Sequence, residues 1–450
     1  MVKANPGGRI RGRVVSGDRP LADVRCSDGR RVVATDRDGR FVIDAGAESG
    51  PFVFVVIPRG YWTERFYVPT AEARAREVVF DLEPTGPADR YSAVYIADIH
   101  LGEGNREVSY ERFSATVDEL NRMASRPAFV LADGDICLQS GQGERYVEIM
   151  SKLKMPVRNG VGNHEIMVSA ANPRGRFHEL FGPTYYSFDY GRVHYVVMDG
   201  CVIDPEGEGY KNVVGEVGPT ELAWLEEDLR LVPEDVPTVV AIHIPLVSTY
   251  PERRKTTAKA APWWVVRNAD EVIELFRKFD VRLVLQGHMH ENERIHDGAI
   301  EFVESVSVCG SWWRSKTGRE LAVSGEPRGY RLIEVESGRV SHRYVASAES
   351  RVADPGELVG VEDDRLVAGA DLVVNFFDAS NEAKVRGRID GGAWMPWAPA
   401  KVPGRLADLT AAHHWRCPAD RLAAGRHKVE VRCEDRGRPD VTLVRQLRIG

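Results

Sequence analysis

Residues 93–100 read Ala93-Val-Tyr-Ile-Ala-Asp-Ile-His100, an apolar run that predicts a buried β-strand and ends in a polar Asp-x-His cluster. The same pattern, an apolar run followed by a polar cluster, recurs four times along the chain. The other four clusters are Asp133-Gly-Asp135, Gly162-Asn-His-Glu165, His243 and Gly287-His-Met-His290. In α/β folds the carboxyl ends of strands are where binding sites are built, because the loops there converge on a rigid sheet. The sequence therefore predicts an α/β region with one polar site assembled from all five clusters.

The side chains in these clusters are those that bind a pair of divalent cations. Carboxylates supply negative charge and can bridge two ions, an asparagine amide adds a neutral oxygen, and imidazoles suit zinc, manganese or iron. A Gly-Asp pair alone is uninformative, whereas Gly-Asn-His followed by an acid is expected by chance in only about 0.4% of chains of this composition. The ordered set therefore indicates a dinuclear metal site.

The stretches on either side of the α/β region are β-rich. Short β-type runs, separated by turn residues, precede the linker Pro84-Thr-Gly-Pro87 and predict a small β-sandwich. These runs are Arg9–Ser16, Val24–Cys26, Arg31–Thr35, Arg40–Ile43 and Phe52–Ile57. A β pattern returns beyond about residue 350, at Leu372–Phe377, Lys384–Ile389 and Val441–Arg448, with Asp390-Gly-Gly as a hairpin turn. We therefore predict three domains, at residues 1–86, 87–347 and 348–450.

From Tyr91 onward, strands alternate with helical patterns, which is typical of the α/β class and is expected for the middle domain. We predict helices over Ser109–Ser125 and Thr220–Leu231. A third helix is expected to start at Asn268, because Asn268 and Glu271 have the spacing of a capping box.

Composition excludes several classes of protein. The 450-residue chain is 43% hydrophobic and 28% charged, which excludes a largely disordered protein. Sixty Lys and Arg against 67 Asp and Glu give a net charge of −7, which argues against bulk binding of nucleic acid. No apolar run approaches the roughly 20 residues needed for a membrane span. The six cysteines are scattered and no signal peptide is evident, so we expect reduced thiols and a cytoplasmic protein.

In their order and residue types, the five clusters resemble the motifs of calcineurin-like metallophosphoesterases. Three further stretches are similar to bacterial members that carry an N-terminal and a C-terminal β domain: Gly182-Pro-Thr-Tyr-Tyr-Ser-Phe188, Trp224-Leu-Glu-Glu-Asp-Leu229 and Gly310-Ser-Trp-Trp313. The segment Thr35–Phe41 looks like a hairpin of carboxypeptidase-regulatory-like domains. The resemblance implies a four-layer αββα sandwich, with two sheets face to face and helices outside, flanked by two small β-sandwich domains.

The resemblance also implies a role for each residue of the clusters and two bound divalent ions, Mn²⁺, Fe²⁺ or Zn²⁺. One ion would be held by Asp98, His100, Asp135 and His290. The other would be held by Asp135, Asn163, His243 and His288, so that Asp135 bridges the pair. His164 would face the leaving group of the substrate, and Glu165 would orient His164.

The implied function is hydrolysis of phosphate esters, either monoesters or diesters. Two cations about 3.5–4 Å apart would lower the pKa of a bridging water, and the resulting hydroxide would attack in line with the departing group. A protonated His164 would assist that group. The expected partner is a small phosphate ester, for which cyclic-nucleotide diesters are the first candidate on resemblance alone. The alternative is a catalytically silent scaffold with structural metals, whose β domains bind a glycan or a protein; metal-dependent turnover separates the two.

Four residues outside the clusters are candidates for substrate binding. Arg253 and Arg254 lie in a loop after His243, and either meet the substrate phosphate or stay solvated. Trp312 and Trp313 stand near a motif loop, and either stack on an aromatic part of the substrate or pack internally. Leu138 stands where many relatives have a polar residue, and without a Tyr there we do not expect an iron–tyrosinate centre of the purple-acid-phosphatase type.

Other polar residues are predicted to have structural roles. His194 lies within an apolar strand run and is predicted to be a hydrogen-bonded core histidine. Asp133 is predicted to be a hydrogen-bonding neighbour of the site rather than a ligand. His413 and His414 are predicted to be a surface pair.

Overall fold

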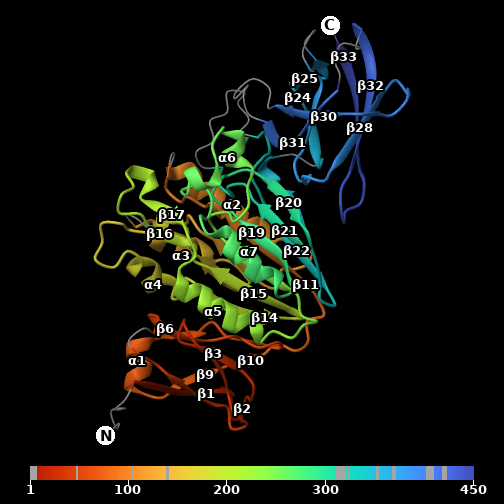
Figure 1. Cartoon of the computed structure of the whole chain (residues 1–450). Coiled ribbons are helices and arrows are strands. Elements are labelled where there is room, and N and C mark those ends of the chain that lie inside the picture. The colour runs from red at the N-terminus through yellow and green to blue at the C-terminus, as the bar shows by residue number, and fades with distance from the viewer. Residues whose placement is uncertain are drawn as a thin grey trace.

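The computed structural model describes residues 8–46, 49–103, 106–137, 141–310, 321–322, 324–350, 354–366, 371–401, 410–417 and 423–449. Three parts follow one another along the molecule, with the N-terminus at one end and the C-terminus at the other (Figure 1). We call them the N-terminal region (residues 8–86), the central region (87–347) and the C-terminal region (348–449). The domain boundaries behind these names stay predictions.

The N-terminal region contains two small facing sheets, as predicted. One sheet has the order β2-β1-β5 with β9 also paired to β1, and the other has the order β4-β3-β6-β8. Their strands are β1 (Arg9–Ser16), β2 (Arg19–Pro20), β5 (Arg40–Asp44), β9 (Val78–Asp81), β4 (Val32–Ala34), β3 (Arg25–Ser27), β6 (Phe52–Val55) and β8 (Tyr67–Pro69). The region also holds helix α1 (Thr70–Ala75) and the paired strands β7 (Tyr61–Trp62) and β10 (Glu83–Pro84). Burial alternates along β1, because successive side chains of a strand point to opposite faces.

The central region is built on two larger sheets. The five-stranded sheet has the order β13 (Val157–Gly160), β12 (Val130–Asp133), β11 (Arg90–Ala97), β22 (Gly329–Glu336), β23 (Arg339–Ala346). The six-stranded sheet has the order β14 (Tyr186–Tyr190), β15 (Val193–Met198), β18 (Thr238–Ile242), β19 (Val281–Gln286), β21 (Ile300–Glu304), β20 (Glu293–Asp297). A small sheet pairs β16 (Cys201–Ile203) with β17 (Val213–Gly215).

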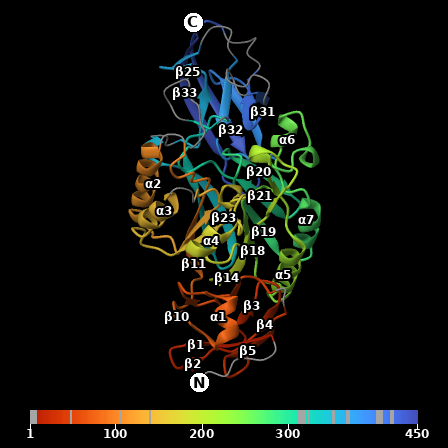
Figure 2. The same cartoon turned by 90° about the vertical axis from the view of Figure 1, so that its left-hand side faces the viewer.

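Helices cover the outer faces of both large sheets. Helices α2 (Arg106–Asn121) and α3 (Gln142–Met150) lie on one side, and α5 (Pro219–Arg230) and α7 (Ala269–Arg277) on the other (Figure 2). The remaining helices are α4 (Gly175–Phe181) and α6 (Tyr250–Arg253). The fold is therefore the predicted four-layer αββα sandwich.

The strands that precede the polar clusters run in parallel within each sheet. β11, β12 and β13 are parallel neighbours, and so are β18 and β19. Their carboxyl ends therefore open on the same edge of the sandwich. This topology brings clusters from positions between 98 and 290 together.

The C-terminal region is a second β-sandwich with its own hydrophobic core, which includes Trp397, Trp415 and Leu443. One sheet has the order β24 (Gly356–Val359), β27 (Val373–Phe376), β31 (Thr410–Arg416), β30 (Ala398–Lys401). The other has the order β25 (Val361–Glu362), β26 (Arg365–Leu366), β33 (Val441–Ile449), β32 (Gly425–Glu434), β28 (Lys384–Ile389), β29 (Met395–Pro396). The predicted hairpin turn is present, with left-handed backbone at Asp390 (φ 51°) and Gly391 (φ 73°) between β28 and β29.

Two local predictions were wrong. His413 and His414 are buried at 1% exposure each, because this part of β31 faces the central region: His413 Nε2 lies 3.6 Å from Glu326 Oε2, and its Nδ1 is 2.6 Å from Asn375 Oδ1. Helix α7 has Asn268 as its N-cap residue, as predicted, but the capping box is absent, because the Asn268 side chain makes no cap hydrogen bond. The Asn268 amide instead bonds the backbone of Val217, accepting from its N–H and donating to its carbonyl.

Two other predictions are confirmed. All six cysteines are buried, and none of them forms a disulfide. The His194 imidazole is fully buried and lies 2.7 Å from Asp189 Oδ1 and 3.0 Å from Asp228 Oδ2. Within the described residues, no helix combines the length and the hydropathy needed to cross a bilayer.

Candidate metal centre

The structure brings the predicted cluster residues together at the carboxyl edge of the two sheets. Five of the predicted ligands have left-handed backbone, which residues other than glycine adopt rarely and mainly at functional sites. These residues are Asp98 (φ 53°), His100 (φ 46°), Asp135 (φ 49°), His288 (φ 77°) and His290 (φ 59°). The left-handed backbone at these residues costs conformational free energy, which the packing of the surrounding sandwich offsets.

The first group of donor atoms contains two carboxylates and two imidazoles. Asp98, His100, Asp135 and His290 each offer one atom, and these atoms all lie within 4.8 Å of one another. His290 Nε2 is 3.2 Å from Asp98 Oδ1, and His100 Nε2 is 3.4 Å from Asp135 Oδ2. The four atoms therefore surround a space that suits one cation.

The second group shares Asp135 with the first. Asp135, His243 and His288 offer donor atoms within 4.8 Å of one another, with His243 Nε2 only 3.1 Å from Asp135 Oδ2. Asn163 Oδ1 and His288 Nδ1 are buried and have no hydrogen-bond partner among the described residues. Such orphaned polar atoms are costly unless something binds them. The donor set fits a second cation beside the first, with Asp135 between them.

Hydrogen bonds to backbone carbonyls determine which ring nitrogen of His243 and of His288 faces this space. His288 Nε2 donates to the carbonyl of Trp263 at 2.7 Å, and His243 Nδ1 lies 3.3 Å from the carbonyl of Asp133. A nitrogen that donates to a carbonyl leaves the other ring nitrogen free to bind a metal. His288 Nδ1 and His243 Nε2 are therefore both directed at the shared space.

The electrostatics of the site favour added positive charge. Burial alone would lower the pKa of His243, but the carboxylates of Asp135 and Asp98 outweigh it and raise that pKa to about 10. Burial would likewise raise the pKa of Asp135, but positive charge on His243 and His164 holds it well below its usual range. Burial and the charge of His243 lower the pKa of His288 to about 4. A cation can take the place of the proton that these carboxylates hold on His243.

Asp133 stays outside both groups of donors. Its Oδ2 accepts a hydrogen bond of 2.8 Å from the Tyr95 hydroxyl. Burial is the main cause that raises the pKa of Asp133 to about 7. This geometry agrees with the expectation that Asp133 supports the site without binding a metal.

Glu103, rather than Glu165, contacts the imidazole of His164. His164 Nδ1 is 3.2 Å from Glu103 Oε1, and the other oxygen of Glu103 is 3.0 Å from His100 Nδ1. Glu165 instead accepts hydrogen bonds of 2.8 Å from the backbone N–H groups of Cys137 and Gly162. Glu165 was expected to orient His164, but its carboxylate instead links two motif loops, and Glu103 makes the contact with His164.

Two further residues, Glu103 and Cys137, contact cluster histidines and were not predicted from the sequence. Cys137 Sγ lies 3.5 Å from His100 Nδ1 and 3.9 Å from His164 Nδ1. Burial raises the pKa of the Cys137 thiol far above its ordinary value, which keeps it protonated. The only available signal was proximity along the chain, because Glu103 follows His100 by three residues and Cys137 follows Asp135 by two.

The two predicted substrate-binding arginines are engaged with neighbouring side chains. Arg253 is ion-paired with Glu291 and lies 3.9 Å from Glu293. Arg254 donates to the Tyr250 hydroxyl at 2.8 Å, with its guanidinium 4.8 Å from the centre of that ring. Trp312, Trp313 and Leu138 lie outside the described residues.

The loops around the site contribute an aromatic side chain with a nearby cation. The ammonium of Lys211 lies 4.2 Å from the ring centre of Trp263, whose carbonyl accepts the hydrogen bond from His288. The Trp263 backbone therefore borders the metal centre through His288, and its ring lies beside a cation.

We predict that Gly162→Ala weakens metal binding at least about tenfold, because a Cβ there would lie 2.4 Å from both the N and the Oδ1 of Asp135. Metal affinity measured by competition with a chelator tests this. Gly218→Ala is the matched control, since a Cβ at Gly218 meets nothing within 4 Å. Equal affinities for both variants would contradict the close packing of Asp135 on Gly162.

Comparison with known families agrees with this geometry along most of the chain. Residues 8–85 match the family model described as N terminal of Calcineurin-like phosphoesterase. Residues 92–292 match the model described as Calcineurin-like phosphoesterase, and residues 303–404 the model for the C terminal of the same proteins.

Individual relatives are distant. A 3',5'-cyclic-nucleotide phosphodiesterase, alr5338, of Nostoc sp. is 24% identical over 258 residues, which is 54% of this chain and 87% of that protein. The cAMP/cGMP dual specificity phosphodiesterase MT0825 of Mycobacterium tuberculosis is 24% identical over 45% of this chain and 63% of its own length. Among solved structures, phosphopantetheinyl hydrolase of Mycobacterium tuberculosis is 14% identical, over 51% of this chain and 94% of that one, with a TM-score of 0.35.

Proposed function

Because the chain belongs to the calcineurin-like phosphoesterase family, we propose that it hydrolyses phosphodiesters with two divalent cations held at the centre described above. The observation that carries this proposal is the position of Asp135, whose carboxylate belongs to both groups of donor atoms. A shared carboxylate is the usual link between two catalytic cations. Divalent cations bound there supply Lewis acidity, which lowers the pKa of a water molecule and neutralises phosphate oxygens.

The residues of this chain have distinct tasks in the proposed reaction. One cation would be held by Asp98, His100, Asp135 and His290, and the other by Asp135, Asn163, His243 and His288. The backbone carbonyls of Asp133 and Trp263 keep the imidazoles of the second group in the binding tautomer.

His164 is the proposed proton donor to the leaving oxygen. Its Nδ1 contacts Glu103, and its Nε2 lies 4.0 Å from Asp135 Oδ2. The side chain is 31% exposed, so a substrate can reach it. Glu103 would orient the ring and stabilise its charged form, so that Nε2 carries the proton that the departing alkoxide takes.

Two considerations favour a diester over a monoester. The named activity of both cyclic-nucleotide relatives is diester hydrolysis. In addition, Arg253 and Arg254 are engaged with Glu291 and Tyr250. A diester carries one negative charge and a monoester up to two, so the diester depends less on added arginines. A small nucleotide diester is therefore the proposed substrate class, and Mn²⁺, Fe²⁺ or Zn²⁺ the proposed ions.

Substrate preference tests the proposal directly. We expect the protein, stripped with chelator and reloaded with Mn²⁺, Zn²⁺, Fe²⁺ or Mg²⁺ in separate samples, to hydrolyse bis(p-nitrophenyl) phosphate with a kcat/KM about tenfold or more above that for p-nitrophenyl phosphate. The reverse ratio would make it a phosphomonoesterase. Bound metal without turnover of either ester would favour the silent scaffold instead.

A further inference from the structure

Two segments that border the candidate metal centre also lie against the C-terminal region. Asn292 follows His290 by two residues, and the segment Glu304–Ser307 continues from the end of β21. Ser307 Oγ donates a 2.7 Å hydrogen bond to the carbonyl of Asp98. The backbone of Asp98, a predicted ligand, is therefore supported by the second segment.

Both segments are held by one buried arginine of the central region, Arg331 on β22. Its Nε donates to Ser305 Oγ at 2.9 Å, and its Nη2 donates to the Glu304 carbonyl at 3.1 Å and to Asn292 Oδ1 at 3.3 Å. The residue is 0% exposed. A single guanidinium thus fixes the segment after His290 to the segment that supports Asp98.

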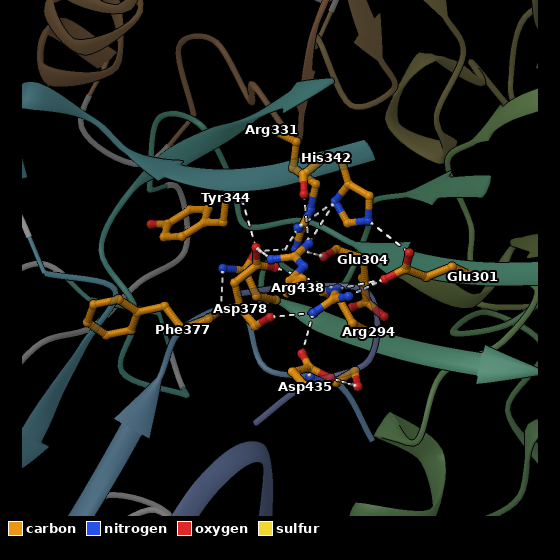
Figure 3. Close-up of polar contacts among 12 residues, drawn as sticks. Arg294, Glu301, Glu304, Arg331, His342, Tyr344, Phe377, Asp378, Asp435 and Arg438 are labelled. Carbon is orange, nitrogen blue, oxygen red and sulfur yellow. Dashed lines mark hydrogen bonds and ion pairs between the residues drawn. The ribbon is translucent and has the colours of Figure 1, made fainter. Parts of the chain in front are cut away.

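The remaining nitrogen of Arg331 is bound by the C-terminal region. Arg331 Nη1 donates to Asp378 Oδ1 at 2.7 Å (Figure 3). Asp378 follows β27, and its other oxygen accepts from the backbone N–H of Tyr344 at 2.9 Å and from Arg438. Burial would raise the pKa of Asp378, but Arg331, Arg438 and Arg294 outweigh it and hold that pKa well below its usual range.

Further contacts join the same parts of the two regions. Asn292 Nδ2 donates to the carbonyl of Phe377 at 3.0 Å, and Arg294 Nη1 donates to that of Asp378 at 2.7 Å. A cavity of about 1130 Å³ lies between the regions and is lined by Asp378 and Arg438 among others, while Arg331 lies behind its wall. Arg331 is fully buried, whereas the side chain of Asp378 is 15% exposed, so loss of the Asp378 carboxylate would leave the buried charge of Arg331 without its ion-pair partner, which is costly.

We propose that Arg331 is a positioning residue for the metal centre and that Asp378 of the C-terminal region holds it in place. The inference rests on the proposed function, because it concerns the ligands assigned there. Groups behind the ligands orient them, and their loss typically costs about 10–100-fold in metal affinity. The C-terminal sandwich thereby completes the site from behind, although it contributes no ligand to either donor group.

Asp378→Asn tests this inference, because it leaves the buried charge of Arg331 without its carboxylate. We expect metal affinity, measured by chelator competition, to fall about tenfold or more, and kcat to fall with little change in KM. Asp390→Asn is the matched control, since Asp390 is an exposed carboxylate of the same region that pairs with His427 at 2.7 Å. Ser305→Ala removes one acceptor of Arg331 without unpairing a charge, and should lower metal affinity in the same direction by a smaller factor.

The outcomes separate this inference from the proposed function. Wild-type metal affinity in Asp378→Asn, even with a lower Tm, would overturn the inference, because the contact would then only join two regions. Should Asp378→Asn fail to fold, unchanged affinity in Ser305→Ala would overturn it equally. Wild-type protein that binds metal but hydrolyses no phosphate ester would contradict the proposed function, while the affinity comparison would still decide the inference. Wild-type protein that binds no metal would overturn both.

Discussion

Asp135→Asn is expected to reduce hydrolysis of phosphodiesters by about 10³-fold or more, with loss of at least one of two bound ions. The reason is that Asp135 alone belongs to both donor groups. An asparagine keeps the size of the side chain but removes its charge and one of its two oxygens. The measurement is kcat together with the metal content of the purified protein.

Asp133→Asn is the matched control for this experiment. Asp133 is buried like Asp135 and stands two residues before it, but it bonds Tyr95 and lies outside both donor groups. An amide oxygen at position 133 can still accept the hydrogen bond of Tyr95. We therefore expect two bound ions and activity within about tenfold of the wild type. Full activity in Asp135→Asn, or equal losses in both variants, would contradict the bridging role.

The sequence was sufficient to predict the αββα sandwich and the convergence of the clusters, and the reason is physical. Asp98, Asp135 and His243 each come directly or shortly after a buried parallel strand, and parallel strands end on the same edge of a sheet. Once the strands were identified from their apolar runs, the topology left these side chains one place to meet. The metal ligands proposed here are the ones predicted.

Contacts made by loops could not be predicted in the same way. Glu103 reaches His164 because the chain turns at Gly102, which has a φ of +81°, and no periodic pattern marks such a contact. The carboxylate of Glu165 looked equally suitable in the sequence, but its position after Gly162 directs it to backbone N–H groups. Likewise, an arginine in a polar loop is expected to be solvated. The side chain of Arg253 is instead largely covered, because it pairs with Glu291.

Contacts between the three regions could not be predicted from the sequence either. Arg331 and Asp378 are 47 residues apart and belong to separately predicted domains. His413 was misassigned for the same reason, because its Nε2 lies 3.6 Å from Glu326 Oε2 of the central region. A polar residue in a strand is predicted to be exposed unless the part of the protein that covers it is known.

His164→Ala is expected to lower kcat by about 10²–10⁴-fold without loss of bound metal, because the proposed role of His164 is to protonate the leaving oxygen. The loss should depend on the leaving group. An alkyl ester, whose alkoxide is a poor leaving group, needs the proton more than a nitrophenyl ester does. We therefore expect a larger loss for the alkyl ester, measured as the ratio of kcat values between variant and wild type for each substrate. His427→Ala, on β32 of the C-terminal region, is the control histidine.

The pH profile gives an independent reading of the same role. Burial lowers the pKa of His164, but the carboxylates of Asp135 and Glu103 outweigh it and raise that pKa to about 9. Since the protonated ring is the active form, the rate should fall as the pH rises through the pKa of His164. Glu103→Gln removes one of the negative charges that raise this pKa, so the fall should move to lower pH. An unmoved basic limb in Glu103→Gln, or an equal loss for both leaving groups in His164→Ala, would assign His164 to substrate binding instead of proton transfer.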